Sequence, residues 1–142
     1  NMAVSFQVPE EGLEHQFDMP KVPMPEELEP EESRRARLAH QLPENIREHF
    51  TRPGPMDVRP VEEDEDLLNP AKAPPYQNVW MRAKGDMPAD LSMHQCVMAY
   101  ASDMTLLDTC LIPHGISWFS GRLQSASLDH AMWFHHPFRA DE

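Results

Sequence analysis

Apolar residues recur every three or four positions between residues 91 and 111, which is the spacing of one face of an α-helix. The positions on this face are Met93, Val97, Tyr100, Met104, Leu107 and Leu111. Polar residues interrupt the stretch only rarely, so the helix is expected to be buried on most sides. Asp90 is a suitable N-cap, and Pro113 with Gly115 is expected to close the C-terminal end.

Other segments alternate between apolar and polar residues with a period of two, as half-buried β-strands do. The expected strands cover residues 2–8, 56–61, 77–84 and 125–138. In the third of these strands, Val79, Met81 and Ala83 share one face. Small residues in the expected helix, such as Ala99 and Ala101, let a sheet approach it closely. The pattern therefore predicts an α+β fold, in which a long helix is wrapped by a curved antiparallel sheet.

Composition divides the chain near Tyr76. Residues 1–75 hold 12 of the 15 prolines and carry 17 acidic against 8 basic residues, whereas residues 76–142 hold 8 of the 11 aromatic residues. A segment this rich in proline cannot build a regular sheet. The first half is therefore expected to be mainly a proline-rich acidic linker, with a helix over residues 31–50 that Pro43 splits. The second half is expected to hold the core.

The whole chain of 142 residues has 24 acidic and 12 basic residues, which gives a formal net charge of −12 and a pI near 5.0. This charge argues against general binding of nucleic acids or anionic membranes, because both require basic patches. No apolar stretch approaches the roughly 20 residues that a bilayer-spanning helix needs. We therefore expect neither a nucleic-acid partner nor a membrane span.

Cysteine and histidine positions give no sign of a cofactor. Cys96 and Cys110 lie in one expected helix, about 21 Å apart, because each residue of a helix rises 1.5 Å. A disulfide cannot bridge that distance, so two buried reduced thiols are predicted. Adjacent His135 and His136 would point to opposite faces of a strand, and no zinc-like spacing accompanies them. Glycine-rich phosphate loops and dinucleotide fingerprints are missing too, so we predict no metal and no other cofactor.

Asp129 is the candidate catalytic residue. It stands in an apolar stretch beside Leu128 and Ala131, and a carboxylate in such surroundings needs hydrogen-bond partners. It is suited to accept a proton from a water molecule or to orient that water. The alternative is a structural acceptor tied to backbone N–H groups. The residue pattern alone leaves both interpretations open.

The stretch that contains Asp129 resembles a known family. Residues 126–138, ASLDHAMWFHHPF, are similar to the signature of the type II acyl-CoA thioesterases, the TesB family. Further similar stretches occur in the same order along the chain, at residues 1–7, 58–62, 95–103 and 113–116. The resemblance covers nearly the whole chain. One departure is His136, which stands where an Arg is common in the family.

Members of that family have two hotdog folds in one polypeptide, and each fold is a long helix wrapped by an antiparallel sheet. The resemblance implies that residues 1–8 are the last strand of the N-terminal hotdog. Residues 9–55 would then be the inter-domain linker, and residues 56–142 the first part of an incomplete C-terminal hotdog. The chain is accordingly expected to be a fragment of a longer protein.

The resemblance also implies an activity, the hydrolysis of fatty acyl-CoA to free fatty acid and CoA. Asp129 stands at the position of the family's catalytic Asp, which orients a water together with a Thr or Ser and a Gln. These partners belong to later strands beyond Glu142, so the fragment alone is expected to be inactive. The full-length protein is expected to be a homo-oligomer and to be cytoplasmic, or peroxisomal if it comes from an animal.

The composition keeps a second interpretation open. In it, the acidic proline-rich half is an interaction arm, and the hotdog-like half is a non-catalytic module for oligomerisation. Strands that carry the Thr or Ser and the Gln beyond Glu142 would favour the enzyme, and their absence would favour the module.

Overall fold

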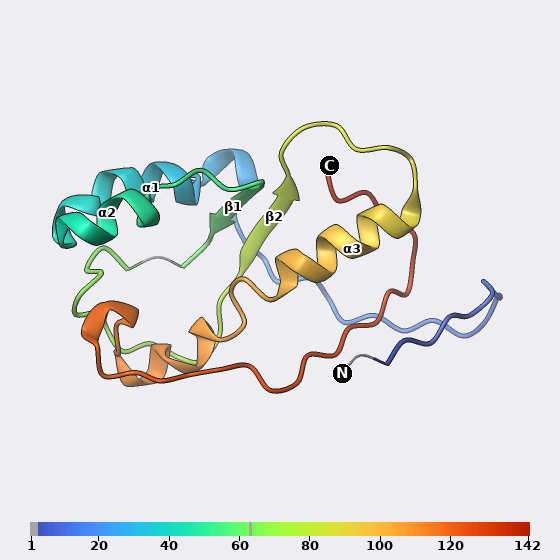
Figure 1. Cartoon of the computed structure of the whole chain (residues 1–142). Helices are drawn as coiled ribbons and strands as arrows, with labels where there is room; N and C mark the ends of the chain where they lie inside the picture. Colours follow the sequence, from blue (N-terminus) through green and yellow to red (C-terminus); the bar gives the residue numbers. More distant parts are fainter. Residues whose placement is uncertain (1–2, 63) are drawn as a thin grey trace.

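The computed structural model describes residues 3–62 and 64–142 (Figure 1). Within these residues, helices surround a central pair of strands. The helices are α1 (Glu31–Leu38), α2 (Glu44–Phe50) and α3 (Leu91–Ser102), and the strands are β1 (Met56–Pro60) and β2 (Val79–Ala83). Single 3-10 turns are η1 (Pro25–Glu27), η2 (Ala39–Gln41), η3 (Asp108–Cys110), η4 (Ile112–His114) and η5 (Trp118–Ser120).

The two strands pair antiparallel, with Val58 opposite Met81, and one face of the pair packs against α3. The core consists of Met56, Val58 and Ala101, with Val79, Met81, Ala83 and Val97 packed against them. The small side chain of Ala101 is fully buried, which allows the helix to lie close to the strands. The predicted strands over 56–61 and 77–84 and the shared face of the second are therefore confirmed. The α+β class of a helix on an antiparallel sheet is confirmed as well.

Helix α3 begins where the sequence predicts and ends earlier. The side chain of Asp90 accepts a hydrogen bond from the backbone N–H of Ser92 at 3.0 Å, as expected for an N-cap. The helix ends at Ser102, however, and turns follow, so the prediction of one helix to residue 111 was wrong. Ser102 Oγ donates to the carbonyl of Ala99, and Asp103 comes next. Short polar side chains of this kind compete with the helical hydrogen-bond pattern.

The expectation that this helix is buried on most sides was also wrong. Met93, Tyr100, Met104 and Leu106 are exposed. Two strands cover one side of a helix, and in the described residues no further strand joins this sheet. Cys96 and Cys110 are free thiols, as predicted, but both are exposed and they lie in different elements.

Two predicted strands are absent from the described residues. Residues 3–8 and 125–138 form no strand, and Met2 of the first prediction lies outside the described residues. Alternation records a preference for a half-buried strand, but a strand forms only when a neighbour supplies the hydrogen bonds of its backbone. The strands of the described residues supply none to these segments. The assignment of residues 1–8 to a preceding hotdog stays a prediction.

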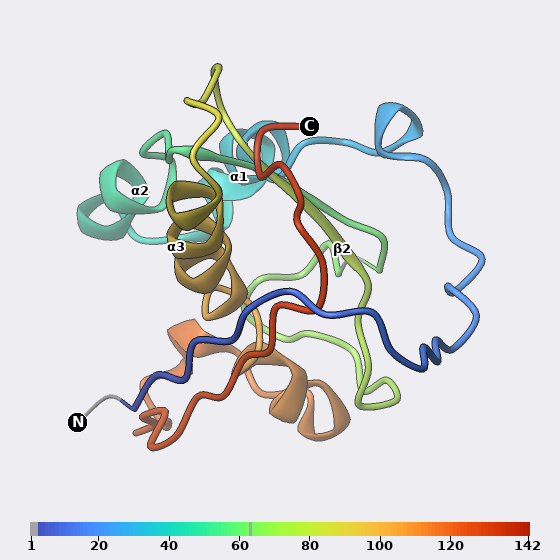
Figure 2. The same ribbon diagram turned by 90° about the vertical axis from the view of Figure 1, so that its right-hand side faces the viewer.

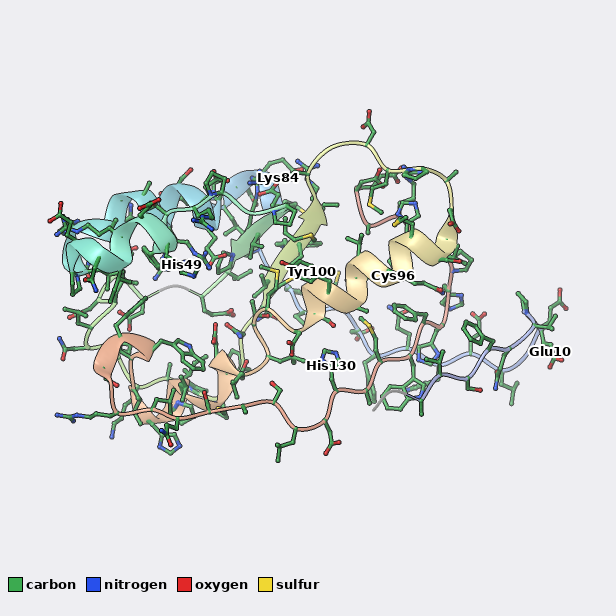
Figure 3. All side chains as sticks on the ribbon, viewed as in Figure 1. Glu10, His49, Lys84, Cys96, Tyr100 and His130 are labelled. Carbon is green, nitrogen blue, oxygen red and sulfur yellow. The ribbon has the colours of Figure 1, made fainter. Side chains whose placement is uncertain are left out.

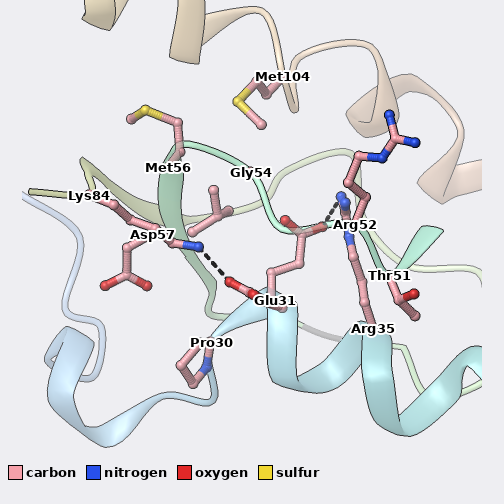
Figure 4. A pocket seen from close by; sticks show the side chains of 12 residues that line it. Pro30, Glu31, Arg35, Thr51, Arg52, Gly54, Met56, Asp57, Lys84 and Met104 are labelled. Atoms are coloured by element: carbon pink, nitrogen blue, oxygen red, sulfur yellow. Dashed lines mark hydrogen bonds and ion pairs between the residues drawn. The ribbon is translucent and has the colours of Figure 1, made fainter. Parts of the chain in front are cut away.

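The predicted helix over residues 31–50 exists in two parts, α1 and α2, and Pro43 stands between them as the N-cap residue of α2. Glu32 of α1 pairs with Lys84 at the end of β2, beside a cavity of about 70 Å³ (Figure 4). On α1, Arg37 also pairs with Glu65. The Glu32–Lys84 pair therefore joins the first half of the chain, residues 1–75, to the second.

The face of the strand pair that is turned away from α3 binds the proline-rich segment around residues 23–25. Trp80 Nε1 donates to the carbonyl of Pro23 at 3.0 Å, and Arg59 donates to that of Pro25 at 2.6 Å. Asp57 orients Arg59 at 3.1 Å, and the Arg59 guanidinium lowers the pKa of that carboxyl. None of the helices in the described residues is long and apolar enough to cross a membrane.

Candidate active site

Asp129 lines a hollow of about 420 Å³ beside the C-terminal half of α3. The hollow is formed by Ala99, Tyr100, Asp103, Met104, Ser127, Leu128, Asp129 and His130. Asp129 itself is exposed. Within residues 3–62 and 64–142 it makes no hydrogen bond or ion pair. The structure therefore gives no support to the alternative of a structural acceptor tied to backbone N–H groups, and it leaves the carboxylate open to the hollow.

The neighbouring His130 joins the segment of Asp129 to the end of α3. His130 Nε2 lies 3.1 Å from Ser102 Oγ, and His130 Nδ1 lies 3.4 Å from Asp103 Oδ1. The sulfur of Met132 lies 3.9 Å from the same Ser102 hydroxyl. In Figure 3 the ring of His130 lies beside the end of this helix. His130 and Met132 thus both reach the hydroxyl of Ser102, although their segment forms no strand.

The same segment is fastened a second time, at the beginning of α3. The backbone N–H of Ala140 donates to Nδ1 of the buried His94 at 3.1 Å, and the carbonyl of Ala140 accepts from Ala83 of β2 at 2.6 Å. Figure 2 shows the C-terminal segment, in red, running along α3 in the opposite direction. Asp129 is therefore placed by a segment that follows the helix from its end to its start.

A second hollow, of about 380 Å³, lies among the turns that follow α3. Its lining is mainly apolar and includes Leu111, Ile116 and Phe119. Asp108 also lines it, and burial raises the pKa of this carboxyl, although Trp118 Nε1 donates to Asp108 Oδ1 at 2.7 Å. Sequence reasoning missed this hollow because it treated Asp108 as a polar interruption of one long helix.

The described residues contain no group of three or more His, Cys, Asp and Glu side chains that could hold a metal ion. The ring of His130, the residue after Asp129, contacts one hydroxyl and one carboxylate, those of Ser102 and Asp103. The hollow thus presents the carboxylate of Asp129 and the imidazole of His130, two groups that can accept, donate or orient protons.

Comparison with known proteins decides the family. The family model described as "Acyl-CoA thioesterase" matches residues 46–142. The chain belongs to the acyl-CoA thioesterase family. It is 37% identical over 138 residues to "Acyl-CoA thioesterase 2" of Haemophilus influenzae, a match that covers 97% of this chain and 48% of that relative. It is also 39% identical over 136 residues to "Acyl-coenzyme A thioesterase 8" of Homo sapiens, covering 91% of this chain and 42% of the relative.

A solved acyl-CoA thioesterase has a similar structure. The crystal structure of the acyl-CoA thioesterase II TesB2 from Mycobacterium marinum matches with a TM-score of 0.62 at 38% sequence identity. The match covers 96% of this chain and 44% of that chain. The resemblance to type II acyl-CoA thioesterases and to their hotdog fold is therefore confirmed. The chain spans about half the length of the curated relatives it matches.

Proposed function

We propose that the natural protein containing these residues hydrolyses fatty acyl-CoA thioesters to free fatty acid and CoA, with Asp129 as the residue that directs the attacking water. Membership of the acyl-CoA thioesterase family carries this proposal. The position of Asp129, unpaired and open to a hollow beside α3, is compatible with it. The non-catalytic alternative gains no support, since each relative described above is named a thioesterase.

Hydrolysis of a thioester requires mainly that the protein positions a water molecule against the carbonyl carbon. A water oxygen attacks the thioester carbonyl carbon, while Asp129 accepts the proton that this water loses. The carbon–sulfur bond then breaks, and the CoA sulfur leaves and takes up a proton. A carboxylate does this work only when water and carbonyl are held in line and the developing oxyanion finds a hydrogen-bond donor. We assign the holding of the water to a Thr or Ser and a Gln, as the family resemblance implies.

The direct test is substitution of Asp129 in the full-length natural protein. Asp129→Asn keeps the size of the side chain but removes the proton acceptor, so kcat for palmitoyl-CoA should fall by about 100-fold or more. The release of free CoA thiol measures the rate. Asp86→Asn is the matched control, because Asp86 is an exposed carboxylate in the turn after β2. Equal activity of both variants would reject the role of Asp129.

The proposal includes a homo-oligomeric protein in the cytoplasm, or in peroxisomes if the source is an animal. Exposed apolar side chains such as Tyr100, Leu106 and Leu128 offer surface for association. The two free thiols suit a reducing compartment. Light scattering of the full-length protein measures its mass in solution, and a mass equal to one chain would reject the oligomer.

A further inference from the structure

We propose that His130 is a positioning residue for Asp129, and that Asp103 and Ser102 hold its imidazole against the end of α3. This inference rests on the proposed function. The two ring nitrogens of His130 lie 3.1 Å from Ser102 Oγ and 3.4 Å from Asp103 Oδ1. Asp129 is the preceding residue and lines the same hollow as His130 and Asp103.

The backbone around Asp129 depends on these side-chain contacts. In the described chain, residues 123–139 make no backbone–backbone hydrogen bond. Between residues 123 and 138, the side-chain hydrogen bonds are those of His130 and Met132, and all of them end on Ser102 or Asp103. A loss of the imidazole therefore frees the segment that carries the carboxylate, whereas a segment in a ladder would stay in place.

The hydrogen-bond donors and acceptors of the cluster agree with a holding role. Ser102 Oγ donates to the carbonyl of Ala99 at 2.9 Å and lies 3.1 Å from His130 Nε2, so this one hydroxyl ties the ring to the last turn of α3. The Asp103 carboxylate can only accept, and it accepts from Nδ1–H.

Ser102, His130 and Asp103 are connected in the order of a Ser–His–Asp triad, but the surroundings of Ser102 argue against a nucleophile. Its hydroxyl lies in the last turn of α3, where the negative end of the helix dipole opposes an alkoxide. This hydroxyl donates its hydrogen bond to the backbone carbonyl of Ala99, and Ser102 is not among the residues that line the hollow. The hydroxyl therefore holds the ring and does not attack the substrate.

The experiment measures kcat and KM for palmitoyl-CoA in the full-length natural protein. His130→Ala should lower kcat by about 10- to 100-fold while KM changes by less than about 3-fold, because a misplaced carboxylate slows the chemical step and leaves binding intact. Asp103→Asn should lower kcat in the same way. The double variant should be no slower than His130→Ala alone, since both changes break one unit.

Conservative variants separate positioning from folding. His130→Asn places an amide nitrogen where Nδ1 lies, so it should recover part of the kcat that His130→Ala loses, and it should do so only while Asp103 is present. Ser102→Ala removes one of the two contacts that hold the ring, so it should lower kcat by about 3- to 10-fold, and the natural protein should form no acyl-serine. His135→Asn is the matched control, because His135 is an exposed histidine in the same segment.

The outcomes distinguish this inference from the proposed function. If Asp129→Asn abolishes hydrolysis while His130→Ala and Asp103→Asn keep the natural kcat, the positioning role is overturned and the proposed function stands. Additive losses in the double variant, or an equal loss with His130→Asn and His130→Ala, also overturn it. Loss of activity in Ser102→Ala, with an acyl-serine in the natural protein, replaces it by a nucleophilic role. Full activity of Asp129→Asn rejects the proposed function itself.

Discussion

His94 Nδ1 accepts a hydrogen bond from the backbone N–H of Ala140 at 3.1 Å, and this bond fastens the C-terminal segment to the first turns of α3. Both residues are buried. His94→Ala leaves the N–H of Ala140 without its acceptor, so the free energy of unfolding should fall by about 1–3 kcal/mol. Urea denaturation followed by circular dichroism measures the change.

His94→Asn is the control for that change, because its amide oxygen can stand where Nδ1 accepts from Ala140. In the described residues His94 Nε2 is buried without a hydrogen-bond partner, so the shorter Asn gives up no hydrogen bond there. The Asn variant should therefore be more stable than the Ala variant. Equal losses would mean that His94 contributes through packing and not through its hydrogen bond.

Gly115 is the residue after η4, and its backbone has a φ of +61°. A Cβ at this position would lie 2.9 Å from the carbonyl oxygen of Pro70. Gly115→Ala should therefore lower the free energy of unfolding by about 1–3 kcal/mol, through backbone strain and a close contact. The control is Gly12→Ala, which meets nothing within 4 Å and should leave thermal stability unchanged. An unaltered melting temperature for Gly115→Ala contradicts this account.

Because of Asp108, the free energy of unfolding should fall as the pH rises. Burial raises the pKa of its carboxyl above the ordinary 3.8, so the folded state holds this proton more tightly than the unfolded state does. The resulting stability is present below 3.8 and is lost as the pH rises through the raised value. Asp108→Asn keeps an acceptor for Trp118 and carries no charge. The variant should gain stability relative to the natural chain between about pH 3 and pH 7.

The pKa of Asp66 is shifted in the opposite direction to that of Asp108, so its effect on stability should have the opposite dependence on pH. The backbone N–H groups of Asn69 and Leu68 donate to its carboxylate and lower its pKa. The stability that this adds is present above the ordinary value of 3.8 and is lost as the pH falls through the lowered one. Asp66→Asn should therefore lose stability relative to the natural chain at neutral pH. If both variants gained or both lost stability at neutral pH, at least one of the two assignments would be wrong.

The 142 residues alone should not hydrolyse palmitoyl-CoA. Asp129 is exposed, and among the described residues its hollow is lined by a single hydroxyl amino acid of the Thr or Ser type, Ser127, and by no Gln. A carboxylate in contact with bulk water cannot hold one water molecule in line with a carbonyl. A thiol-release assay should give the rate of buffer alone. Turnover that disappears in Asp129→Asn would show that the partners of Asp129 lie within these residues.

The local parts of the fold could be predicted from the sequence. Asp90 caps its helix, Pro43 separates two helices, and Val79 and Met81 face the core because these outcomes depend on neighbours along the chain. Whether residues 125–138 form a strand could not be predicted from alternation, and in the structure they form none. The hydrogen bonds of such a strand have to come from a distant segment, and alternation says nothing about whether that segment is present.

The candidate site divides in the same way. Asp129 was found through its motif, which lies within a single stretch of sequence. The contacts of His130 with Ser102 and Asp103 join residues 28 and 27 positions apart, so no local pattern contains them. The early end of α3 decides this geometry, since Ser102 and Asp103 form its last turn and cap instead of the middle of a longer helix.

The hydrogen bonds from Trp80 and Arg59 to the carbonyls of Pro23 and Pro25 fix this part of the chain to the strand pair. Only the residues ahead of Pro23 are left to span the distance to anything attached at the N-terminal side. Measured from this docking point, residues 9–22 can reach at most on the order of 45 Å even when fully extended. A domain attached ahead of residue 9 would consequently be confined to a small volume around the strand pair. Its effective concentration there would be high, so a weak affinity between the two would suffice to keep them together.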